Sequence, residues 1–414
     1  MRKRRQPIVT GLDIGTTKVC AIIGHADADG ALTVLGVGSH PSQGLKKGMV
    51  VDIEMTVDSI QKAVREAEQV AGVSVKQVYV GIAGGHISST NSKGIVEIPN
   101  RQRGVTEQDC QRVLELARKI TVPHDIEILQ VIPQEYVLDG QPGIKNPVGM
   151  TCSILEVRAH VVLAAMTSAS NIMRCIKHAG LQTCEIMLES LASAVAILGE
   201  HEKDLGVILI DIGGGTSDIA VFSGGTVKFS GVIPLGGDSI TNDIAYGLKV
   251  NRYDAENIKK KHASALPGEV DPDEKIEISD VLKQEPHLVS RRFLCEITEA
   301  RLEQIFMMAK DMLDKSPVRD RVFGGVVLTG GTSLMHGITR LAERIFELPA
   351  KVGMPQNVKG LSGIVKSPIY STCIGLVLQG IATQAVSPAF YSNGSIFGRL
   401  AHRLRKAIDW YLFD

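Results

Sequence analysis

The sequence predicts an α/β protein of two duplicated halves, with a small α+β module inserted into the first half. The main observation is that two stretches share one pattern, VTGLDIGTTKVCAII at 9–23 and VILIDIGGGTSDIAVF at 207–222. Each is an apolar run, an Asp-Ile-Gly turn and a second apolar run, which is typical of strand, tight turn and strand. Because one such unit opens each half, we infer an internal duplication with a pseudo-twofold arrangement. Over 86–163 the pattern changes to short strand-like pieces around one helix.

The composition limits the classes of protein to which the chain can belong. Its 414 residues are enough for two or more domains with their own cores. The 45 basic residues balance the 45 acidic ones, which argues against bulk binding of nucleic acid. The seven cysteines are scattered without a CxxC pair, which indicates reduced thiols rather than a metal or disulfide framework. No apolar run approaches the ~20 residues of a membrane span, and the start MRKRRQP lacks the apolar region of a secretory signal.

Apolar spacing predicts the elements of the first half. Residues 8–38 indicate a meander of three strands, and 56–71 have helical spacing with Gly72 as a candidate C-cap. A strand over 77–82 leads into the module. After the module we expect strands at 155–165 and 184–188 and helices at 168–179 and 191–198.

The inserted module contains one predicted helix, over 106–120. Thr106 and Asp109 have the spacing of a capping box at its start. The stretch 132–150, IPQEYVLDGQPGIKNPVGM, is rich in Pro and Gly and closes the module.

The second half repeats the plan of the first. A further Gly-Gly turn in VIPLGGDSIT, at 232–241, leads into a helix, whereas 250–290 is charged and interrupted by proline, which indicates surface. A third Gly turn, in VVLTGGTSLMHGI at 326–338, follows a strand and precedes a helix. The remaining predictions are a long helix over 297–313, a strand near 350–352, a helix over 371–380 and a polar linker over 382–394.

The Gly turns have two possible roles. Consecutive glycines lack Cβ atoms, so their N–H groups can converge on an anion such as a phosphate. Asp13 and Asp211, each at a strand end, could hold Mg²⁺ through water. Two turns that face each other could bind one polyphosphate, and the third could bind a phosphate or ribose edge at a helix N-terminus. The alternative is an ordinary Gly-rich hairpin.

The last segment, 395–414, has the pattern of a cationic amphipathic helix. Its apolar and aromatic residues are Ile396, Phe397, Leu400, Leu404, Ile408, Trp410, Tyr411 and Leu412. The basic residues that favour an anionic membrane surface are Arg399, Arg403, Arg405 and Lys406. Such a helix is marginal alone in water and must bury its stripe, either in a bilayer interface or on the protein's own core.

The three Gly turns, in this order and spacing, resemble the nucleotide site of the actin/Hsp70/sugar-kinase ATPase superfamily. DIGTTK at 13–18 is similar to its first phosphate motif, 211–218 to its second, and LTGGTS at 328–333 to its adenosine motif. Within this superfamily the inserted module, with VIPQEYVLDGQPGIKNPVG at 131–149, resembles the FtsA family of bacterial cell-division proteins, as does LKKGMVVDIE at 45–54.

The resemblance implies an actin-like (ribonuclease H-like) duplicated two-domain fold. An inserted α+β subdomain lies in the first half, and an amphipathic membrane-targeting helix ends the chain. The implied domains are 1–85 with 164–199 (1A), 86–163 (1C), 200–227 with 306–381 (2A), 228–305 (2B), the linker 382–394 and the helix 395–414.

The resemblance also implies site residues. Asp13 and Asp211 would hold Mg²⁺ through water, Lys18 would bind phosphate, and Glu189 stands where stronger hydrolases polarise water. The backbone groups around the nucleotide would come from Gly15, Thr16, Thr17, Gly213, Gly214, Gly215, Thr216, Gly330, Gly331 and Thr332. Glu296 and Glu299 would approach the ribose and purine, or would be exposed helix carboxylates.

The family's role would make this chain a membrane-tethered, ATP-binding scaffold of cell division, with Mg-ATP as ligand and weak or no hydrolysis. It would polymerise at the cytoplasmic face of the inner membrane, at the septum. It would anchor the ring of the tubulin-like protein FtsZ and recruit later division proteins through the inserted subdomain. For the acidic FtsZ tail, Arg291, Arg292 and Arg301 are candidate contacts, or simply a solvated basic face. The alternatives are a pilus-assembly or rod-shape scaffold, or a sugar or acetate kinase.

Overall fold

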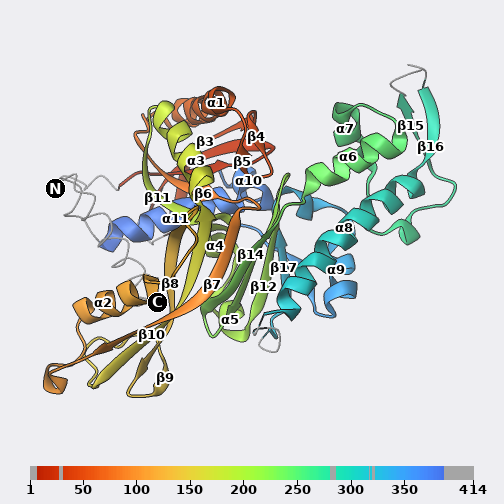
Figure 1. The fold of residues 1–414 in the computed structure, drawn as a ribbon. Helices are drawn as coiled ribbons and strands as arrows, with labels where there is room; N and C mark the ends of the chain where they lie inside the picture. The colour runs from red at the N-terminus through yellow and green to blue at the C-terminus, as the bar shows by residue number, and fades with distance from the viewer. Residues whose placement is uncertain (1–6, 28–30, 280–285, 317, 319–321, 387–414) are drawn as a thin grey trace.

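The computed structural model describes residues 7–27, 31–279, 286–316, 318 and 322–386, and Figure 1 draws it as a ribbon. The predicted terminal helix over 395–414 lies outside these residues, as does the linker after residue 386. Two mixed β-sheets form the two halves, and a third sheet belongs to the inserted module.

The first-half sheet is built around β1 (Val9–Ile14), a strand that is buried on both faces. Strands β2 (Lys18–Ala26) and β3 (Leu32–Pro41) follow antiparallel to it, as the predicted meander requires. On the other side β6 (Gln77–Ile82) and β11 (Gln182–Leu188) add in parallel. A last strand, β19 (Val358–Gly360), comes from far along the chain and pairs with β3.

The second-half sheet has the same order and the same strand directions. Strands β12 (Val207–Ile212), β13 (Ser217–Ser223) and β14 (Thr226–Ile233) form the antiparallel meander. Strands β17 (Val326–Thr329) and β18 (Ala350–Val352) add in parallel beside β12. The predicted duplication is therefore confirmed by topology, since each half runs third, second, first, fourth and fifth strand across its sheet.

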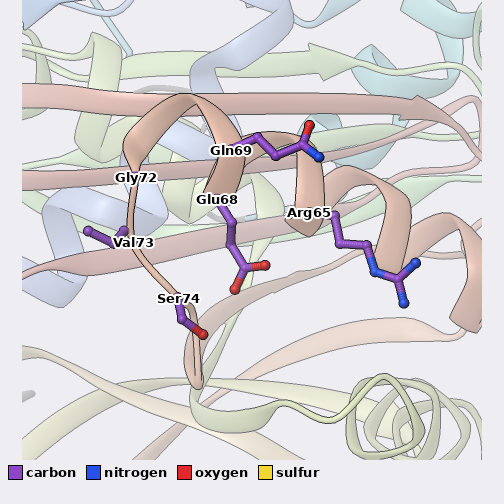
Figure 2. A pocket seen from close by; sticks show the side chains of 6 residues that line it. All are labelled: Arg65, Glu68, Gln69, Gly72, Val73 and Ser74. Carbon is purple, nitrogen blue, oxygen red and sulfur yellow. The ribbon is translucent and has the colours of Figure 1, made fainter.

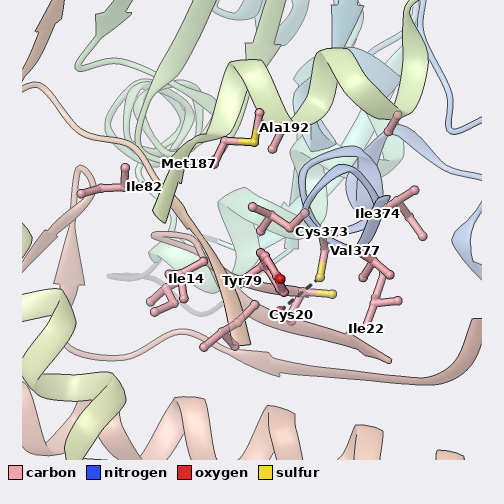
Figure 3. Packing of buried hydrophobic residues seen from close by; sticks show 14 of the residues in the cluster. Ile14, Cys20, Ile22, Tyr79, Ile82, Met187, Ala192, Cys373, Ile374 and Val377 are labelled. Carbon is pink, nitrogen blue, oxygen red and sulfur yellow. Dashed lines mark hydrogen bonds between the residues drawn. The ribbon is translucent and has the colours of Figure 1, made fainter. Parts of the chain in front are cut away.

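Two helices join the halves. Helix α4 (Glu189–Ile197) packs on helix α11 (Ser371–Val386), and the pair lies against β1 and β12. The two helices cross so closely that a Cβ atom on Gly375 would be 1.7 Å from the carbonyl oxygen of Ala192. Figure 3 shows the buried residues of this region, where α11 contributes Cys373, Ile374 and Val377 to the core of the first-half sheet.

The inserted module has its own sheet and its own core. Its sheet has the order β7, β10, β8, β9, and helix α2 covers one face. Thr106 and Asp109 form the capping box that the sequence predicts, and α2 begins directly after Thr106. The elements are β7 (Ile87–Glu97), η1 (Arg101–Arg103), α2 (Glu107–Arg118), β8 (Ile126–Leu138), β9 (Gln141–Ile144) and β10 (Ile154–Ala165).

The region 250–290 contains more regular structure than predicted. It forms helix α7 (Arg252–His262) and the hairpin of β15 (Lys275–Ser279) and β16 (Pro286–Ser290). Helix α8 begins at Arg291 rather than at 297, because Ser290 caps it by accepting from the backbone N–H of Phe293.

The last described helix also differs from its prediction. Helix α11 continues to Val386, so the start of the predicted linker is helical. Thr383 is still buried there, so packing extends the helix past the polar sequence signal. The remaining elements are β4 (Leu45–Lys46), β5 (Met49–Val50), α1 (Ile53–Ala71), α3 (Met166–His178), α5 (Glu200–Leu205), α6 (Gly237–Leu248), η2 (Pro267–Glu269), η4 (Gly331–Leu334), α9 (Ile338–Phe346), α10 (Ser362–Val365) and η5 (Pro368–Tyr370).

The structure also describes the cysteines and the character of the helices. Each of the seven cysteines is free, and all but Cys184 are buried, as the prediction of reduced thiols requires. Within the described residues, no helix has both the length and the apolar character needed to cross a membrane.

Candidate nucleotide site

The first two Gly turns have the same backbone geometry. The N–H group of Gly15 donates to the carbonyl oxygen of Lys18 at 3.1 Å, and that of Gly213 donates to Thr216 at 3.0 Å. In each half an aspartate stands two positions before this glycine, near the end of the first strand. The duplication therefore brings equivalent acidic groups and equivalent turns to both halves.

The two turns lie against each other across the boundary between the halves. A Cβ atom on Gly214 would be 1.6 Å from the hydroxyl oxygen of Thr17, and one on Gly215 would be 2.4 Å from that of Thr16. The hydroxyl group of Thr16 also accepts from the backbone N–H of Gly48, at 3.0 Å. No side chain fits between these turns, so backbone and threonine hydroxyl groups form their surface.

Four carboxyl groups gather beside the turns. Asp13 and Asp211 are 7% exposed and Asp218 is 2% exposed, while Glu189 stands at the N-terminus of α4. Burial raises the pKa of Asp13 to about 6; Lys18 opposes this rise and Asp211 adds to it. Burial also raises the pKa of Glu189 well above its usual range, and repulsion from the three aspartates raises it further.

The connecting helices hold Asp211 in place. Ser193 of α4 donates to Asp211 Oδ2 at 2.6 Å, and Thr372 of α11 donates to the same oxygen at 3.2 Å. Both hydrogen bonds lower the pKa of Asp211, although burial raises it overall. The two connecting helices α4 and α11, called the hinge helices below, thus meet the second turn at the carboxylate of Asp211.

Lys18 is the basic side chain beside Asp13 and Asp211. Its Nζ donates to the carbonyl oxygen of Ile369 at 2.9 Å and lies 4.3 Å from the centre of the Tyr370 ring. Lys18 lowers the pKa of both Asp13 and Asp211. This arrangement is that of a partly buried lysine in a charged site.

The charge of the site fits a bound divalent cation. Asp218 Oδ1 is buried and has no hydrogen-bond partner among the described residues, although Thr216 donates to the other oxygen at 3.0 Å. Burial and the charge of Asp211 raise the pKa of Asp218 well above its usual range. Among the described residues no group of three or more His, Cys, Asp or Glu side chains is arranged as a direct metal site. A cation held by Asp13 and Asp211 through water, as predicted, does not need such a group.

The third Gly turn packs directly on the second. Gly330 has φ 82°, and a Cβ atom there would be 2.4 Å from Asp211 Oδ1, so both its conformation and its surroundings require glycine. Thr332 donates to the carbonyl oxygen of Gly213 at 3.2 Å. The predicted phosphate and adenosine turns are therefore adjacent in the fold.

Helix α6 adds a part that sequence reasoning missed. The backbone N–H groups of Gly237 and Asp238 donate to the carbonyl oxygens of Gly213 and Gly214, at 2.9 and 2.8 Å. Lys259 of α7 donates to the carbonyl oxygen of Gly237 at 3.0 Å and pairs with Glu256 at 2.7 Å. Two sequence signals were present: the Gly-Gly turn in 232–241, which was predicted only to lead into a helix, and an acid and a base three residues apart in a region predicted as surface.

The other predicted site residues are engaged elsewhere. Glu296 pairs with Arg292 at 3.7 Å, and Glu299 pairs with Arg344 of α9 at 2.8 Å. Neither ion pair involves the Gly330 turn. Contact of the two glutamates with ribose or purine stays a prediction.

All three candidate partner arginines have acidic partners within the chain, and two of them bind both oxygens of their partner. Arg291 donates to both oxygens of Glu274, at 2.9 and 2.8 Å, and Arg301 does the same with Asp243, at 2.6 and 2.8 Å. Of the three arginines, Arg292 has the longest ion pair and the largest exposed fraction, 45% of its side chain.

A separate hollow lies at the C-terminal end of α1, far along the chain from the turns. It has a volume of about 360 Å³, and Figure 2 shows its lining residues: Arg65, Glu68, Gln69, Gly72, Val73 and Ser74. Gly72 caps the helix in the left-handed conformation, as predicted, and Glu68 accepts from the N–H of Val75 at 2.6 Å. The hollow belongs to this helix end, and none of its residues lies in a Gly turn.

Comparisons with known proteins agree with the fold and show the family. The model of the family Cell division protein FtsA matches residues 208–375, and that of the SHS2 domain inserted in FTSA matches 84–163. The Cell division protein FtsA of Pseudomonas aeruginosa is 45% identical over 408 residues, which cover 97% of each chain. The chain belongs to the FtsA family of cell division proteins.

Solved structures support the same fold at lower sequence identity. A chain of the PilM-PilN type IV pilus biogenesis complex is 16% identical, with a TM-score of 0.62. The match covers 90% of this chain and 98% of that one. MreB 5 of Spiroplasma citri bound to AMPPNP is 15% identical with a TM-score of 0.54, over 90% of this chain and 95% of that one. The predicted actin-like fold and the predicted family are therefore both confirmed.

Proposed function

We propose that this cell-division protein binds Mg-ATP between its two halves and acts as a membrane-tethered scaffold. The observation that carries the proposal is the contact of the first two Gly turns, with Asp13 and Asp211 buried beside them. Glycine-rich turns from both halves lie side by side, and backbone N–H groups in such turns can converge on a polyphosphate. The solved MreB structure bound to AMPPNP supports the same ligand class for this fold.

The chain's own residues divide the binding between them. Asp13 and Asp211 would hold Mg²⁺ through water, and Asp218 Oδ1 would face the same cation. Lys18 would bind a phosphate oxygen, and the turn of Gly330 and Thr332 would face the adenosine. The cation would neutralise charge on the carboxylates and the phosphates.

We expect slow hydrolysis or none. Burial and three neighbouring aspartates hold the pKa of Glu189 above its usual range. The two residues that follow it, Ser190 and Leu191, depart from the Glu-Pro pattern of the strong hydrolases of the superfamily. This favours ATP as a conformational ligand over ATP as a rapidly consumed substrate.

The scaffold role rests on the family together with the terminal segment. The family makes the chain a cell division protein. The amphipathic pattern of 395–414 supports tethering at the cytoplasmic face of the inner membrane. We further propose that the protein self-assembles and that it recruits later division proteins through the inserted module. The FtsZ tail would bind within residues 228–305, where Arg292 is the most accessible of the three candidate arginines.

The test of nucleotide binding is titration of a fluorescent ATP analogue with and without Mg²⁺. Asp211→Ala is expected to abolish Mg-dependent binding, because it removes the carboxylate that both hinge helices orient. Asp58→Ala is the matched control, since Asp58 is exposed on α1 and forms a surface ion pair with Lys62. Normal affinity in Asp211→Ala would reject the site.

A further inference from the structure

The inserted module is docked on the second half of the protein as well as joined to the first. Strand β7 is an edge of the module's sheet, and β14 is an edge of the second-half sheet. The two strands lie in contact, and Figure 1 shows β7 next to β14. They are not paired as a continuous sheet. Side chains make this contact instead.

Side chains of the module cover the open edge of β14. Ser89 Oγ donates to the carbonyl oxygen of Ser230 at 2.6 Å. Asn91 Nδ2 donates to that of Lys228 at 3.2 Å, and Gln134 Nε2 to that of Val227 at 2.8 Å. Backbone carbonyls of an edge strand need partners when they are buried, so these donors hold the two halves together specifically.

His160 is the centre of this interface. It is 1% exposed, its Nδ1 lies 2.8 Å from Asn91 Oδ1, and its Nε2 lies 2.8 Å from the hydroxyl oxygen of Ser230. Because the amide oxygen of Asn91 can only accept, Nδ1 must carry the proton, and Nε2 then accepts from Ser230. Burial lowers the pKa of His160 to about 4, so the ring is neutral and the tautomer is fixed.

The module is a stiff extension of the first half. Strands β7 and β10 pair without interruption from Ile87 with Ala164 to Glu97 with Ile154. They begin and end at the first half, where β6 leads into β7 and β10 leads into α3. A movement of the first half relative to the second therefore has to move the module relative to β14.

Strand β14 leads in turn to the nucleotide site. Directly after it, the carbonyl oxygen of Leu235 accepts from the hydroxyl of Ser217 at 2.8 Å, and the N–H of Gly237 donates to Gly213 at 2.9 Å. The edge that the module covers is thus a few residues from the second Gly turn.

We propose that the inserted module is a brace that ties the two halves together across the nucleotide cleft, so that nucleotide release requires rupture of the His160–Asn91–Ser230 network. The cleft otherwise depends on the hinge helices α4 and α11 and on the Gly turns. A partner that binds the module and draws it away from β14 would then accelerate exchange of the nucleotide. This inference rests on the proposed nucleotide binding.

The test is a double-mutant cycle across the interface. Asn91→Ala in the module and Ser230→Ala in β14 are each expected to release a fluorescent ADP analogue about three- to tenfold faster, the factor that loss of one or two hydrogen bonds produces. The double variant is expected to gain less than the product of the two factors, because both changes break one network. Arg158→Ala is the control, because Arg158 lies on β10, the strand of His160, but pairs with Glu135 and Glu156 inside the module.

A second measurement separates the brace from nucleotide binding. Hydrogen exchange of the 226–233 amides, without nucleotide, is expected to be faster in Asn91→Ala and unchanged in Arg158→Ala. If wild-type protein binds no nucleotide but this exchange responds, the proposed function fails and the docking stands. If release rates and exchange are unchanged in folded Asn91→Ala and Ser230→Ala, the brace is refuted.

Discussion

Thr17 of the first half lies directly against Gly214 of the second, with its hydroxyl oxygen 1.6 Å from the position that a Cβ atom on Gly214 would take. The contact gives this glycine a reason that does not depend on a ligand. Any side chain at 214 would push the two turns apart.

Gly214→Ala is therefore expected to weaken both ATP affinity and stability. The added methyl group must displace Thr17 or the turn, and such overpacking costs about 1–3 kcal/mol. Titration with a fluorescent ATP analogue should show at least a tenfold weaker affinity, and urea unfolding a lower midpoint. Gly363→Ala is the control, since a Cβ atom on Gly363 meets nothing within 4 Å. Equal affinity in both variants would mean that the turns do not need to touch.

Binding of Mg-ATP is expected to weaken as the pH falls through about 6. Burial raises the pKa of Asp13 to about 6, and a protonated carboxyl no longer attracts a cation. Affinity should be nearly constant above pH 7 and fall by up to about tenfold per pH unit below 6. Lys18→Met should move the midpoint to higher pH, because Lys18 lowers the pKa of Asp13. A midpoint near pH 4 would contradict the burial of this carboxyl.

Asp13→Asn is expected to stabilise the nucleotide-free protein at pH 7 while it destroys Mg-ATP binding. The folded-state pKa of Asp13, about 6, exceeds its ordinary value of 3.8. The folded state therefore holds this proton more tightly, and the stability it contributes is complete below pH 3.8 and lost as the pH rises through 6. Replacing the ionised carboxylate at pH 7 should recover roughly 1–3 kcal/mol in urea unfolding. A loss of stability would show that the carboxylate is already compensated.

The Gly turns were predictable because their chemistry is local. An apolar strand and a short run of small residues define each turn within about ten neighbouring positions, with an aspartate in the first two, and periodicity alone places the strands around them. The capping box of Thr106 and Asp109 was readable for the same reason.

The contacts that complete the site were not predictable, because their partners are remote in sequence. Lys259 reaches the carbonyl oxygen of Gly237 only because α6 and α7 pack together. In the sequence Arg301 has no evident acidic partner, and only folding brings Asp243 against it. Likewise, nothing near His160 in the sequence indicates that its ring forms a hydrogen bond with Ser230. Charge and motif therefore located the turns, whereas tertiary packing decided which charged residues remained available.

The terminal segment leaves two alternatives that one deletion can separate. Removing 395–414 is expected to release the protein from anionic vesicles while ATP affinity and thermal stability stay unchanged. A bilayer-bound helix gains about 1.5–3 kcal/mol for each large apolar side chain that it buries and about 1 kcal/mol for each basic residue near anionic lipid. Leu400→Glu with Leu404→Glu should therefore release the full-length chain almost as well, whereas Ser395→Glu, at the start of the segment, should not. Vesicles without anionic lipid should bind the wild-type chain more weakly. If the deletion instead lowers the melting temperature and leaves vesicle binding intact, the stripe packs on the protein's own core and the membrane tether lies elsewhere.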